Sequence, residues 1–592
     1  MRFKINLSEL TDSLLKGMLR FPLAFLCAFT AMVYGNLLID LRGEEVESRI
    51  PLMISLGLGI SLFTGLGLSA FRKPPLQSLL IQLIGLPILV LCYYLLDGVP
   101  EEIQVGRTFI LGLLFHLYVS LAVSRKNQSQ ELFWQANQAL LLRLLNTAFY
   151  SIVLYGGLAL AMSAIDLLFG VDFNRSYARL YIFILFVFNT WFFLSGLKEE
   201  EEVHFPKGLR VFTQFVLIPL VLIYFLILYA YAGKIVIEWS WPIGWVSNLI
   251  LGFSITGILA YLLVFPISDN ADNRLMRLTG RGIFIALVPL VIMMALAVLR
   301  RINDYGITEE RYYISNLTAW LAFISIFYGF LRSRNIKLIP LSLALIALIN
   351  VVGPLSGVSV SKRNQMARLV LALEENGLME KDQWKAMPEK KLSEEEYKRI
   401  EGPLIYLLNR QHYTLLNSIL PEGVKTDEMM EKHGSYSNAR QILGKMLSDE
   451  HQFNETQWQS FSFRRKGKGI QPPQGNYAAF FHINGNFYND KNKLEYAGMT
   501  FEFQHKGQNL MVKVNEEQLE INLVDQVLKS MNLERSQLKA FDNEFSESQA
   551  WINLKNEHYE IPILLEDFNF NTEDGELVIT NLEYYVWVKK LN

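Results

Sequence analysis

The run from Val211 to Gly233, VFTQFVLIPLVLIYFLILYAYAG, decides the fold class of this chain. It holds no charged residue over about 23 positions, more than the roughly 20 residues that a helix needs to cross the hydrocarbon core of a bilayer. Only a helix satisfies its own backbone N–H and C=O groups in that core, so we expect a membrane-spanning helix here. Gln214 and Pro219 interrupt the run, and both are tolerated in such helices.

Similar apolar runs recur along the first 355 residues, and together they predict a mainly α-helical transmembrane bundle of about eleven spans. The first 20 residues are amphipathic and carry four basic residues, so we interpret residues 1–20 as a cytoplasmic lead-in rather than a cleaved signal. The transmembrane domain is expected over residues 21–355. Its predicted spans are 21–39, 50–71, 76–96, 108–123, 140–168, 177–196, 211–233, 245–265, 283–299, 313–330 and 337–354.

Basic residues between the spans predict the orientation. If the N-terminus is cytoplasmic, the inside loops hold about 17 Lys and Arg residues and the outside loops about 9, which is the bias that cytoplasmic loops show. An odd number of spans then places the C-terminal domain outside the cytoplasm. We therefore expect a multi-pass membrane protein with a cytoplasmic N-terminus and an extracytoplasmic C-terminal domain.

The composition restricts the partners. The 592 residues are 51% hydrophobic and only 19% charged, against about 25% in soluble domains. The net charge of −2 provides no basic surface for nucleic acid, so the expected partners are the lipid bilayer and an envelope protein or small-molecule ligand. Cys27 and Cys92 both lie in apolar runs, which argues against a disulfide framework or a zinc ribbon. We predict no metal site and no cofactor.

The remainder of the chain reads as a soluble α+β domain with an antiparallel sheet. We expect a helical region with a linker over residues 356–475 and a β-rich domain over residues 476–592. Ser393 followed by three glutamates predicts a helix start. Asn484-Gly485 predicts a hairpin turn, and residues 523–531 predict one helix among the strands. Asp567 begins like a calcium loop but lacks the required Gly and Glu, so we interpret it as part of a strand that ends in a turn at residues 573–575.

Charged residues gather at the predicted outer ends of the spans. If the loops around Asp172 and Arg311 meet, they would form a polar site with aromatic walls, suited to a lipid head group, a sugar or a divalent ion. The alternative is a structural ion-pair network that fixes the ends of the helices. The candidate residues are Asp166, Asp172, Arg179, Arg300, Asp304, Tyr305, Glu309 and Arg311.

Apart from tyrosines, His116 is the one ionisable residue near the middle of a predicted span. An ionisable group in lipid is expensive, which makes His116 a candidate for transport or signalling. The alternative is a neutral imidazole hydrogen-bonded to a neighbouring helix, since a lone histidine lacks the carboxylate partner of a proton relay.

Three segments carry a family resemblance: Phe205-Pro206-Lys207-Gly208 before the charge-free span, the loop from Asn303 to Tyr312 (NDYGITEERY), and Gly353-Pro354 leading into Ser359–Arg363. In these segments the chain resembles the bacterial multi-pass membrane family known as domain of unknown function 4153. The resemblance implies a multi-pass architecture and a location in the bacterial inner membrane. The family has no assigned activity, so it implies no catalytic residue.

The sequence favours a non-enzymatic role. It contains no nucleophile elbow, P-loop, zinc-protease or dinucleotide-binding motif. We therefore expect an envelope protein whose extracytoplasmic domain binds a ligand or partner. A secondary transporter is the second hypothesis, although no internal repeat supports it. A membrane enzyme similar to lipid-linked glycosyl transferases is the third, and it rests on layout alone.

Overall fold

The computed structural model divides the chain into two compact units, residues 1–448 and 449–592. Each unit is described by itself. Within them the structure describes residues 15–41, 46, 48–124, 128–170, 173–197, 207–238, 245–267, 274–331, 335–385, 392–421, 424, 439, 442–443, 446–447, 460–465, 473, 477–486, 492–496, 498–506, 508–531, 543–573 and 576–591.

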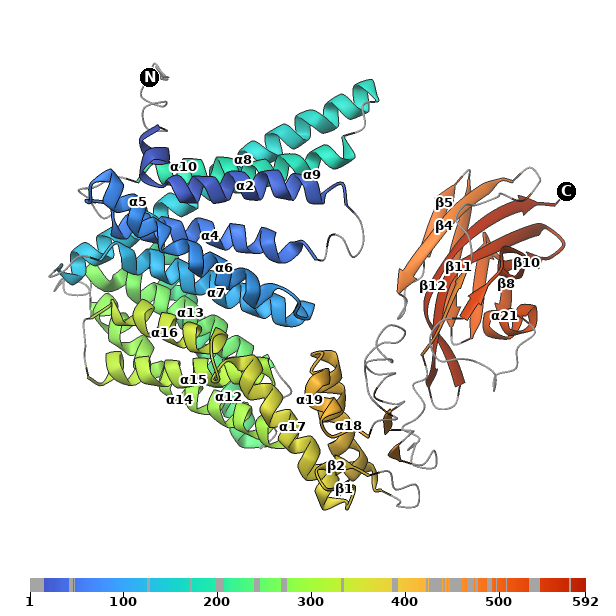
Figure 1. Cartoon of the computed structure of the whole chain (residues 1–592). Coiled ribbons are helices and arrows are strands. Elements are labelled where there is room, and N and C mark those ends of the chain that lie inside the picture. The colour runs from blue at the N-terminus through green and yellow to red at the C-terminus, as the bar shows by residue number, and fades with distance from the viewer. Residues whose placement is uncertain are drawn as a thin grey trace. The chain divides into compact units, whose positions relative to one another are not determined.

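The first unit is built of long helices that lie side by side (Figure 1). Each of the eleven predicted spans falls on a described helix or on a pair of consecutive helices. The helices are α2 (Pro22–Leu38), α4 (Ile50–Ser69), α5 (Pro75–Leu83), α6 (Gly85–Leu96), α7 (Glu101–Ala122), α8 (Gln130–Phe169), α9 (Asn174–Phe183), α10 (Asn189–Ser195), α11 (Lys207–Phe212), α12 (Ile218–Glu238), α13 (Trp245–Val264), α14 (Arg274–Tyr305), α15 (Glu309–Gly329) and α16 (Leu338–Val351), with π-helical turns at Ile184–Phe188 and Thr213–Leu217 and a 3-10 turn at Phe265–Ile267.

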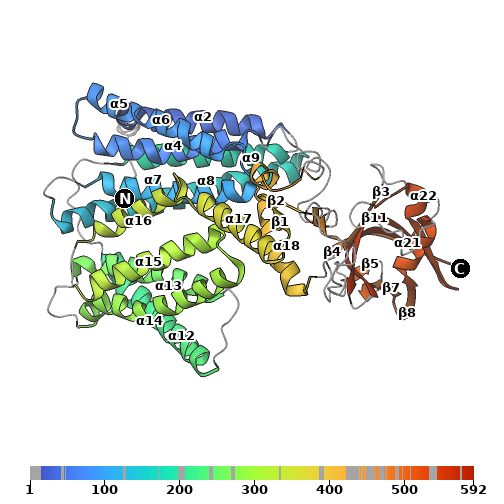
Figure 2. The same ribbon diagram turned by 60° about the horizontal axis from the view of Figure 1, so that its bottom comes forward.

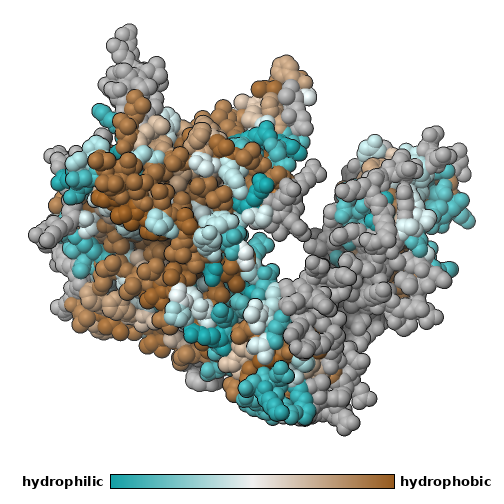
Figure 3. All heavy atoms as spheres, in the orientation of Figure 1, coloured by the Kyte–Doolittle hydropathy of each residue, from teal (hydrophilic) through white to brown (hydrophobic). Residues whose placement is uncertain are grey.

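Eight helices of the described part are long and apolar enough to cross a membrane. Two further apolar helices, α2 and α16, are shorter, at 17 and 14 residues. The first turn of α15 carries Glu309, Glu310 and Arg311. Large apolar side chains cover the outside of this helical unit, as the brown surface in Figure 3 shows, and such a surface is stable in lipid rather than in water. The helices from α2 to α16 are therefore embedded in a membrane, and the count of eleven crossings stays a prediction.

Glycines allow the first helices to approach closely. On α4, a Cβ at Gly65 would lie 2.5 Å from the ring of Tyr118 on α7, and a Cβ at Gly67 would collide with the ring of Phe21. At Gly57 a Cβ would find ordinary contact, 3.5 Å from Phe186. Close backbone approach at small residues is the usual packing of membrane helices, so Gly65 and Gly67 have a structural role in α4.

Arg143 of α8 shows how a charge is held among these helices. Its guanidinium donates hydrogen bonds to the carbonyl oxygens of Phe192 and Phe193 in the last turn of α10, and it lies over the Phe192 ring. The last carbonyls of a helix have no partner within the helix, so a cation there is favourable. Gly196 leaves room for this side chain, because a Cβ at that position would overlap the guanidinium.

The helical region after α16 also belongs to the first unit. Ser356 caps α17 (Gly357–Glu375), and a short hairpin of β1 (Met379–Glu380) and β2 (Gln383–Trp384) leads to α18 (Glu394–Asn409) and α19 (Tyr413–Asn417). The predicted helix start is confirmed, since Ser393 and Glu396 form a capping box at α18. Figure 2 shows α17 and α18 packed beside each other. Their facing side chains form one apolar core, which contains Leu369, Trp384 and Leu404.

The second unit is two packed β-sheets. The six-stranded sheet has the order β4-β12-β11-β3-β9, with β10 also paired to β11, and the four-stranded sheet has the order β5-β6-β7-β8. Every strand pair is antiparallel except β3 with β9 among the described residues, so the predicted antiparallel sheet is largely confirmed. The elements are β3 (Ser460–Arg465), β4 (Ala479–Asn486), β5 (Asn492–Tyr496), β6 (Met499–Lys506), β7 (Asn509–Val514), β8 (Glu517–Asn522), α21 (Leu523–Met531), β9 (Asn543–Phe545), α22 (Glu547–Ala550), β10 (Trp551–Lys555), β11 (Tyr559–Glu573) and β12 (Glu576–Lys590).

One local prediction in this unit is wrong. Asn484 and Gly485 form no turn but lie inside β4, opposite Glu583 and Leu582 of β12. The 15-residue strand β12 supplies backbone partners along the whole of β4, and this pairing overrides the turn preference of the two residues. The helix at Leu523–Met531 is confirmed. Asp567 lies in a strand as predicted, and that strand, β11, ends at Glu573, whereas residues 574 and 575 of the predicted turn lie outside the described residues.

Candidate functional site

The predicted site residues with the most contacts lie in the short connection between α14 and α15. Gly306 takes a left-handed backbone with φ of +76°, a conformation that glycine adopts without strain. A Cβ at Gly306 would lie 2.5 Å from Cδ of Arg368 and 2.8 Å from Nε2 of Gln365. The loop is therefore pressed directly against α17.

Three side chains of α17 hold this loop. Oδ1 of Asn364 accepts a hydrogen bond from the Ile307 amide at 2.7 Å, and Nε2 of Gln365 donates to the Ile307 and Tyr305 carbonyls at 3.1 and 3.2 Å. Arg368 donates to the carbonyls of residues 303 and 304 at 3.2 and 2.9 Å. These bonds satisfy carbonyls at the end of α14 that have no partner within the helix.

Arg311 closes the loop from the other side. From the first turn of α15 it donates to the Gly306 carbonyl at 2.8 Å and to the Tyr305 carbonyl at 3.3 Å. Its guanidinium also lies 5.5 Å from the centre of the Tyr305 ring, which adds a cation–π contact. Arg311 and Arg368 thus place two positive charges at the negative end of the α14 dipole, where cations are favoured.

Glu309 is the buried acid of the site. It is only 5% exposed, and its Oε1 accepts a hydrogen bond from the hydroxyl of Tyr406 at 2.6 Å. Nε of Arg410 lies 3.5 Å from its Oε2, and Nη1 of Arg410 reaches Glu102 of α7 at 3.1 Å. Tyr406 and Arg410 stand four residues apart and so extend from one side of α18. We call this group of side chains the junction. It consists of Glu309, Tyr406, Arg410 and Glu102, together with residues 364–368 of α17, which hold the loop.

Burial and neighbouring charges shift the pKa of two side chains outside the predicted spans: Tyr406 of the junction and His412, which lies beside it. Burial, and then the Glu309 carboxylate, raise the pKa of Tyr406, so its hydroxyl stays a hydrogen-bond donor. Burial, followed by the positive charges of Lys362 and Arg410, lowers the pKa of His412 to about 4. At neutral pH Tyr406 is therefore protonated, and the neighbouring His412 is uncharged.

Some buried polar atoms near Tyr406 have no hydrogen bond within the part of the chain that the structure describes. They are Oγ of Ser361 and Nε2 of His412, together with Oε2 of Glu309 and Nε of Arg410, which face each other as an ion pair at 3.5 Å. The described residues bring together no group of three metal-ligating side chains. The arrangement therefore fits a joint that ties α18 to the membrane helices, with spare hydrogen-bonding capacity inside it.

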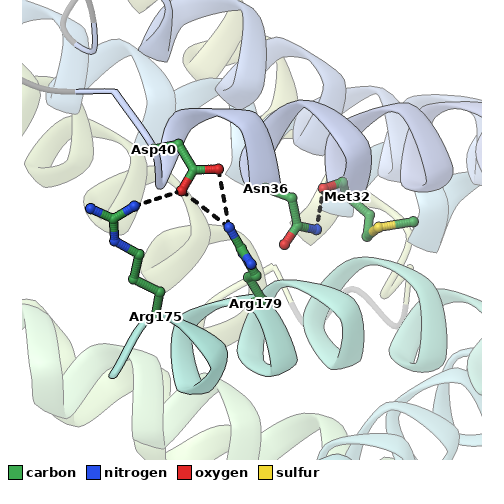
Figure 4. Close-up of polar contacts among 5 residues, drawn as sticks. All are labelled: Met32, Asn36, Asp40, Arg175 and Arg179. Atoms are coloured by element: carbon green, nitrogen blue, oxygen red, sulfur yellow. Dashed lines mark hydrogen bonds and ion pairs between the residues drawn. The ribbon is translucent and has the colours of Figure 1, made fainter. Parts of the chain in front are cut away.

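Arg179, another of the outer-face candidates, belongs to a different group. Arg179 and Arg175 of α9 both bind Asp40 after α2, at 3.0 Å each (Figure 4). All three side chains are about half exposed, so this network contributes at most about 1 kcal/mol per pair. Asp166 lies in the last turn of α8, where its carbonyl accepts a hydrogen bond from Gly170.

The described contacts bring four predicted residues, Asp304, Tyr305, Glu309 and Arg311, to the junction and place Arg179 with Asp40 instead. Arg300 lies one turn before Asp304 on α14 and is exposed. Asp172 lies outside the described residues. A binding site that joins both groups stays a prediction.

His116 lies on the outside of α7. Its Nδ1 bonds the carbonyl of Gly112 at 2.7 Å, one turn earlier on the same helix, rather than a neighbouring helix. The carbonyl can only accept, so Nδ1 carries the proton and Nε2 is left as an acceptor on the exposed side of the ring. A role in transport or signalling stays a prediction for this residue.

The sequence interpretation missed the partners of Glu309 and of the loop. Tyr406 is 97 residues away from Glu309, and Gln365 is 58 residues away from Ile307. One signal was present: an acid at the start of an apolar helix needs a partner if it is buried. The sequence did not identify that partner, because the pairing depends on how α17 and α18 fold back.

The fold and the junction define a multi-pass helical membrane protein in which a helical region beyond the last membrane helix is fastened to the bundle by buried polar contacts. The chain belongs to the family described as domain of unknown function DUF4153, whose model matches residues 22–372. One segment that carried the resemblance, residues 303–312, contains the α14–α15 loop, which packs on α17, and α17 also contains a second such segment, residues 359–363.

The chain is also similar to the uncharacterized protein PM1469 of Pasteurella multocida (strain Pm70), at 24% identity over 232 residues. That match covers 38% of this chain and 39% of the relative. No solved structure matches the chain.

Proposed function

We propose that this chain is a non-enzymatic protein of the bacterial inner membrane whose extracytoplasmic part binds a ligand or a partner protein. The helical bundle anchors the extracytoplasmic part in the membrane. A conformational change in that part on binding is transmitted through the junction to the membrane helices. The N-terminus is cytoplasmic, and α17, α18 and the β-sheet unit lie outside the cytoplasm.

The bond between Glu309 and Tyr406 is the observation that carries this proposal. A buried carboxylate is stable only while its partners stay in place, because removing one partner of a buried charged pair costs about 3–5 kcal/mol. The contacts to Tyr406 and Arg410 therefore favour a firm attachment of α18 over a flexible tether. A change in the helical region would reach α15 through Glu309 and α7 through Glu102.

The β-sheet unit supports a binding role. The facing sides of its two sheets pack together and form the hydrophobic core. Phe480 and Tyr496 are not part of this core and are 52% and 57% exposed. Exposed aromatic side chains are enriched at binding surfaces because they provide apolar area with few flexible bonds.

Orientation is tested with reporters fused after Asn592 in the full chain. Alkaline phosphatase, which folds only outside the cytoplasm, should be active, and green fluorescent protein, which fluoresces only inside, should be dark. The reverse pattern would refute the extracytoplasmic location and with it the outward-facing binding role.

Binding is tested by photo-crosslinking in the native membrane. A photo-reactive amino acid at Tyr496 should give a discrete covalent adduct, and the same group at the exposed Glu520 of β8 serves as the control. Absence of an adduct at every exposed position of the β-sheet unit, together with solute uptake by proteoliposomes of the purified chain, would refute binding and support a transporter.

A further inference from the structure

One face of the six-stranded sheet packs against the four-stranded sheet, and the opposite face is partly exposed at Phe480 and His482. Alternate residues of β4 and β12 point to opposite faces. Phe481 and Tyr584 point inward, where they contact the rings of Phe501 and Phe503 on the other sheet. On a soluble domain the outward face is normally polar.

Aromatic rings lie on this face instead, and they differ in exposure: Phe480 is 52% exposed and the His482 side chain 42%, whereas Trp587 is buried beneath its neighbours at 4%. Phe480 and His482 of β4 stand directly opposite Trp587 and Tyr585 of β12. The ring centres are 5.0 Å apart for Phe480 and Trp587 and 4.4 Å apart for His482 and Tyr585. The ring of Trp551 on β10 continues the cluster, 5.3 Å from Trp587. We name these five residues the aromatic face.

Two carboxylates border the aromatic face. Oε1 of Glu583 pairs with His482 at 2.9 Å, and Oε2 of Glu566 accepts two hydrogen bonds from Arg465 at 2.7 and 2.9 Å. Both acids keep more than a quarter of their side chain exposed. Within the described residues the other oxygen of each carboxylate is left to accept hydrogen bonds, and the Tyr585 hydroxyl lies in the field of both acids.

The chemistry of this surface excludes several occupants. A nucleic acid or an anionic lipid surface needs basic side chains that are free to bind phosphate, whereas Arg465 and Lys589 beside this face are already paired with Glu566 and Glu560. A peptide that adds a strand needs a sheet edge, whereas β12 lies between β4 and β11. The remaining fit is a neutral ligand with flat apolar C–H faces and many hydroxyl donors, and a pyranose ring has both.

We infer that the aromatic face binds a neutral glycan, with sugar rings packed on Phe480 and its neighbours and hydroxyls donating to Glu583 and Glu566. This inference rests on the proposed binding function of the β-sheet unit and gives its ligand a chemical class. Aromatic rings with a few convergent polar groups are the usual composition of a small-ligand site.

The test uses the full chain in lipid nanodiscs with maltohexaose, cellohexaose and chitohexaose. Saturation-transfer difference NMR should show transfer to the ring C–H protons of at least one oligosaccharide. Phe480→Ala should weaken its binding at least tenfold. Because that side chain is half exposed, the substitution leaves the fold in place, which its thermal unfolding will show. Glu583→Gln should weaken binding by a smaller factor and leave the C–H contacts in place.

Glu520→Gln on β8 of the other sheet is the control, since it changes an exposed side chain away from the aromatic face and should leave the affinity unchanged. No transfer to any of the three oligosaccharides, or equal binding by Phe480→Ala and the unchanged chain, would overturn the glycan assignment. A protein adduct from Tyr496 in the crosslinking experiment would then still support the proposed function with a partner other than a glycan.

Discussion

The bond between Tyr406 and Glu309 gives the sharpest test of the junction. Tyr406→Phe keeps the ring and removes only the hydroxyl that donates to Oε1 of Glu309 at 2.6 Å. That distance is typical of a hydrogen bond to an ionised carboxylate. The Glu309 side chain is 7% exposed, so water cannot easily replace the lost donor.

A hydrogen bond to a charged group contributes about 1.5–3 kcal/mol, and we take about 2 kcal/mol for this one. If α18 is held to the bundle through this bond, its backbone amides should open about 30-fold more often in Tyr406→Phe, since about 1.4 kcal/mol corresponds to a factor of ten. Hydrogen exchange of residues 394–409, measured on the full chain in nanodiscs at neutral pH, reports this opening.

Tyr413→Phe is the matched control, because no hydrogen bond of the Tyr413 hydroxyl is present among the described residues, and exchange should change little. In a Glu309→Gln background the bond to Tyr406 becomes neutral, so Tyr406→Phe should then cost only about 1 kcal/mol, or about fivefold in exchange. If Tyr406→Phe changes the exchange of α18 less than threefold, or no more than Tyr413→Phe does, the junction does not hold the helical region and the coupling role fails.

Three further predictions concern the first unit. Gly306→Ala should destabilise the chain by about 2 kcal/mol more than Gly353→Ala in thermal unfolding, because both positions have positive φ but only Gly306 has side chains within 4 Å; equal effects would contradict this. Acidification from pH 6.5 towards pH 4 should lower the stability of the helical region, because the unfolded state takes up a proton that His412, whose pKa is about 4, does not bind when folded; His412→Asn should remove this component of a pH titration followed by hydrogen exchange. Gly67→Ala should lower the unfolding temperature in detergent, whereas Gly57→Ala should leave it nearly unchanged, because only at Gly67 would the new methyl group collide with a ring.

Much of the membrane half could be predicted from the sequence. A run such as Val211–Gly233 can satisfy its backbone only as a helix in lipid, and this local argument needs no knowledge of the neighbouring helices. The capping box at Ser393 and the helix at Leu523–Met531 are local in the same sense. Asn484-Gly485 shows where local reasoning fails, because pairing with a distant strand decided its conformation.

The candidate site was predictable only in part. Asp304, Tyr305, Glu309 and Arg311 were found because they stand close together in the sequence around one loop. Their partners Gln365, Arg368, Tyr406 and Arg410 were not found, because each comes from a helix that returns to the loop from far along the chain. Polar contacts of this kind follow from tertiary packing, which a single sequence does not specify.

The extent of the junction bears on where this protein can be shortened. The family match ends at residue 372, inside α17, whereas Tyr406 and Arg410 lie beyond it. A truncated version that stops at the family boundary would leave the acid at position 309 without its donors and would expose the apolar side of α17 to water. A version that stops after residue 448 retains Tyr406 and Arg410 and the helices that cover α17. It is therefore the better starting point for purification and for electron microscopy of the membrane half.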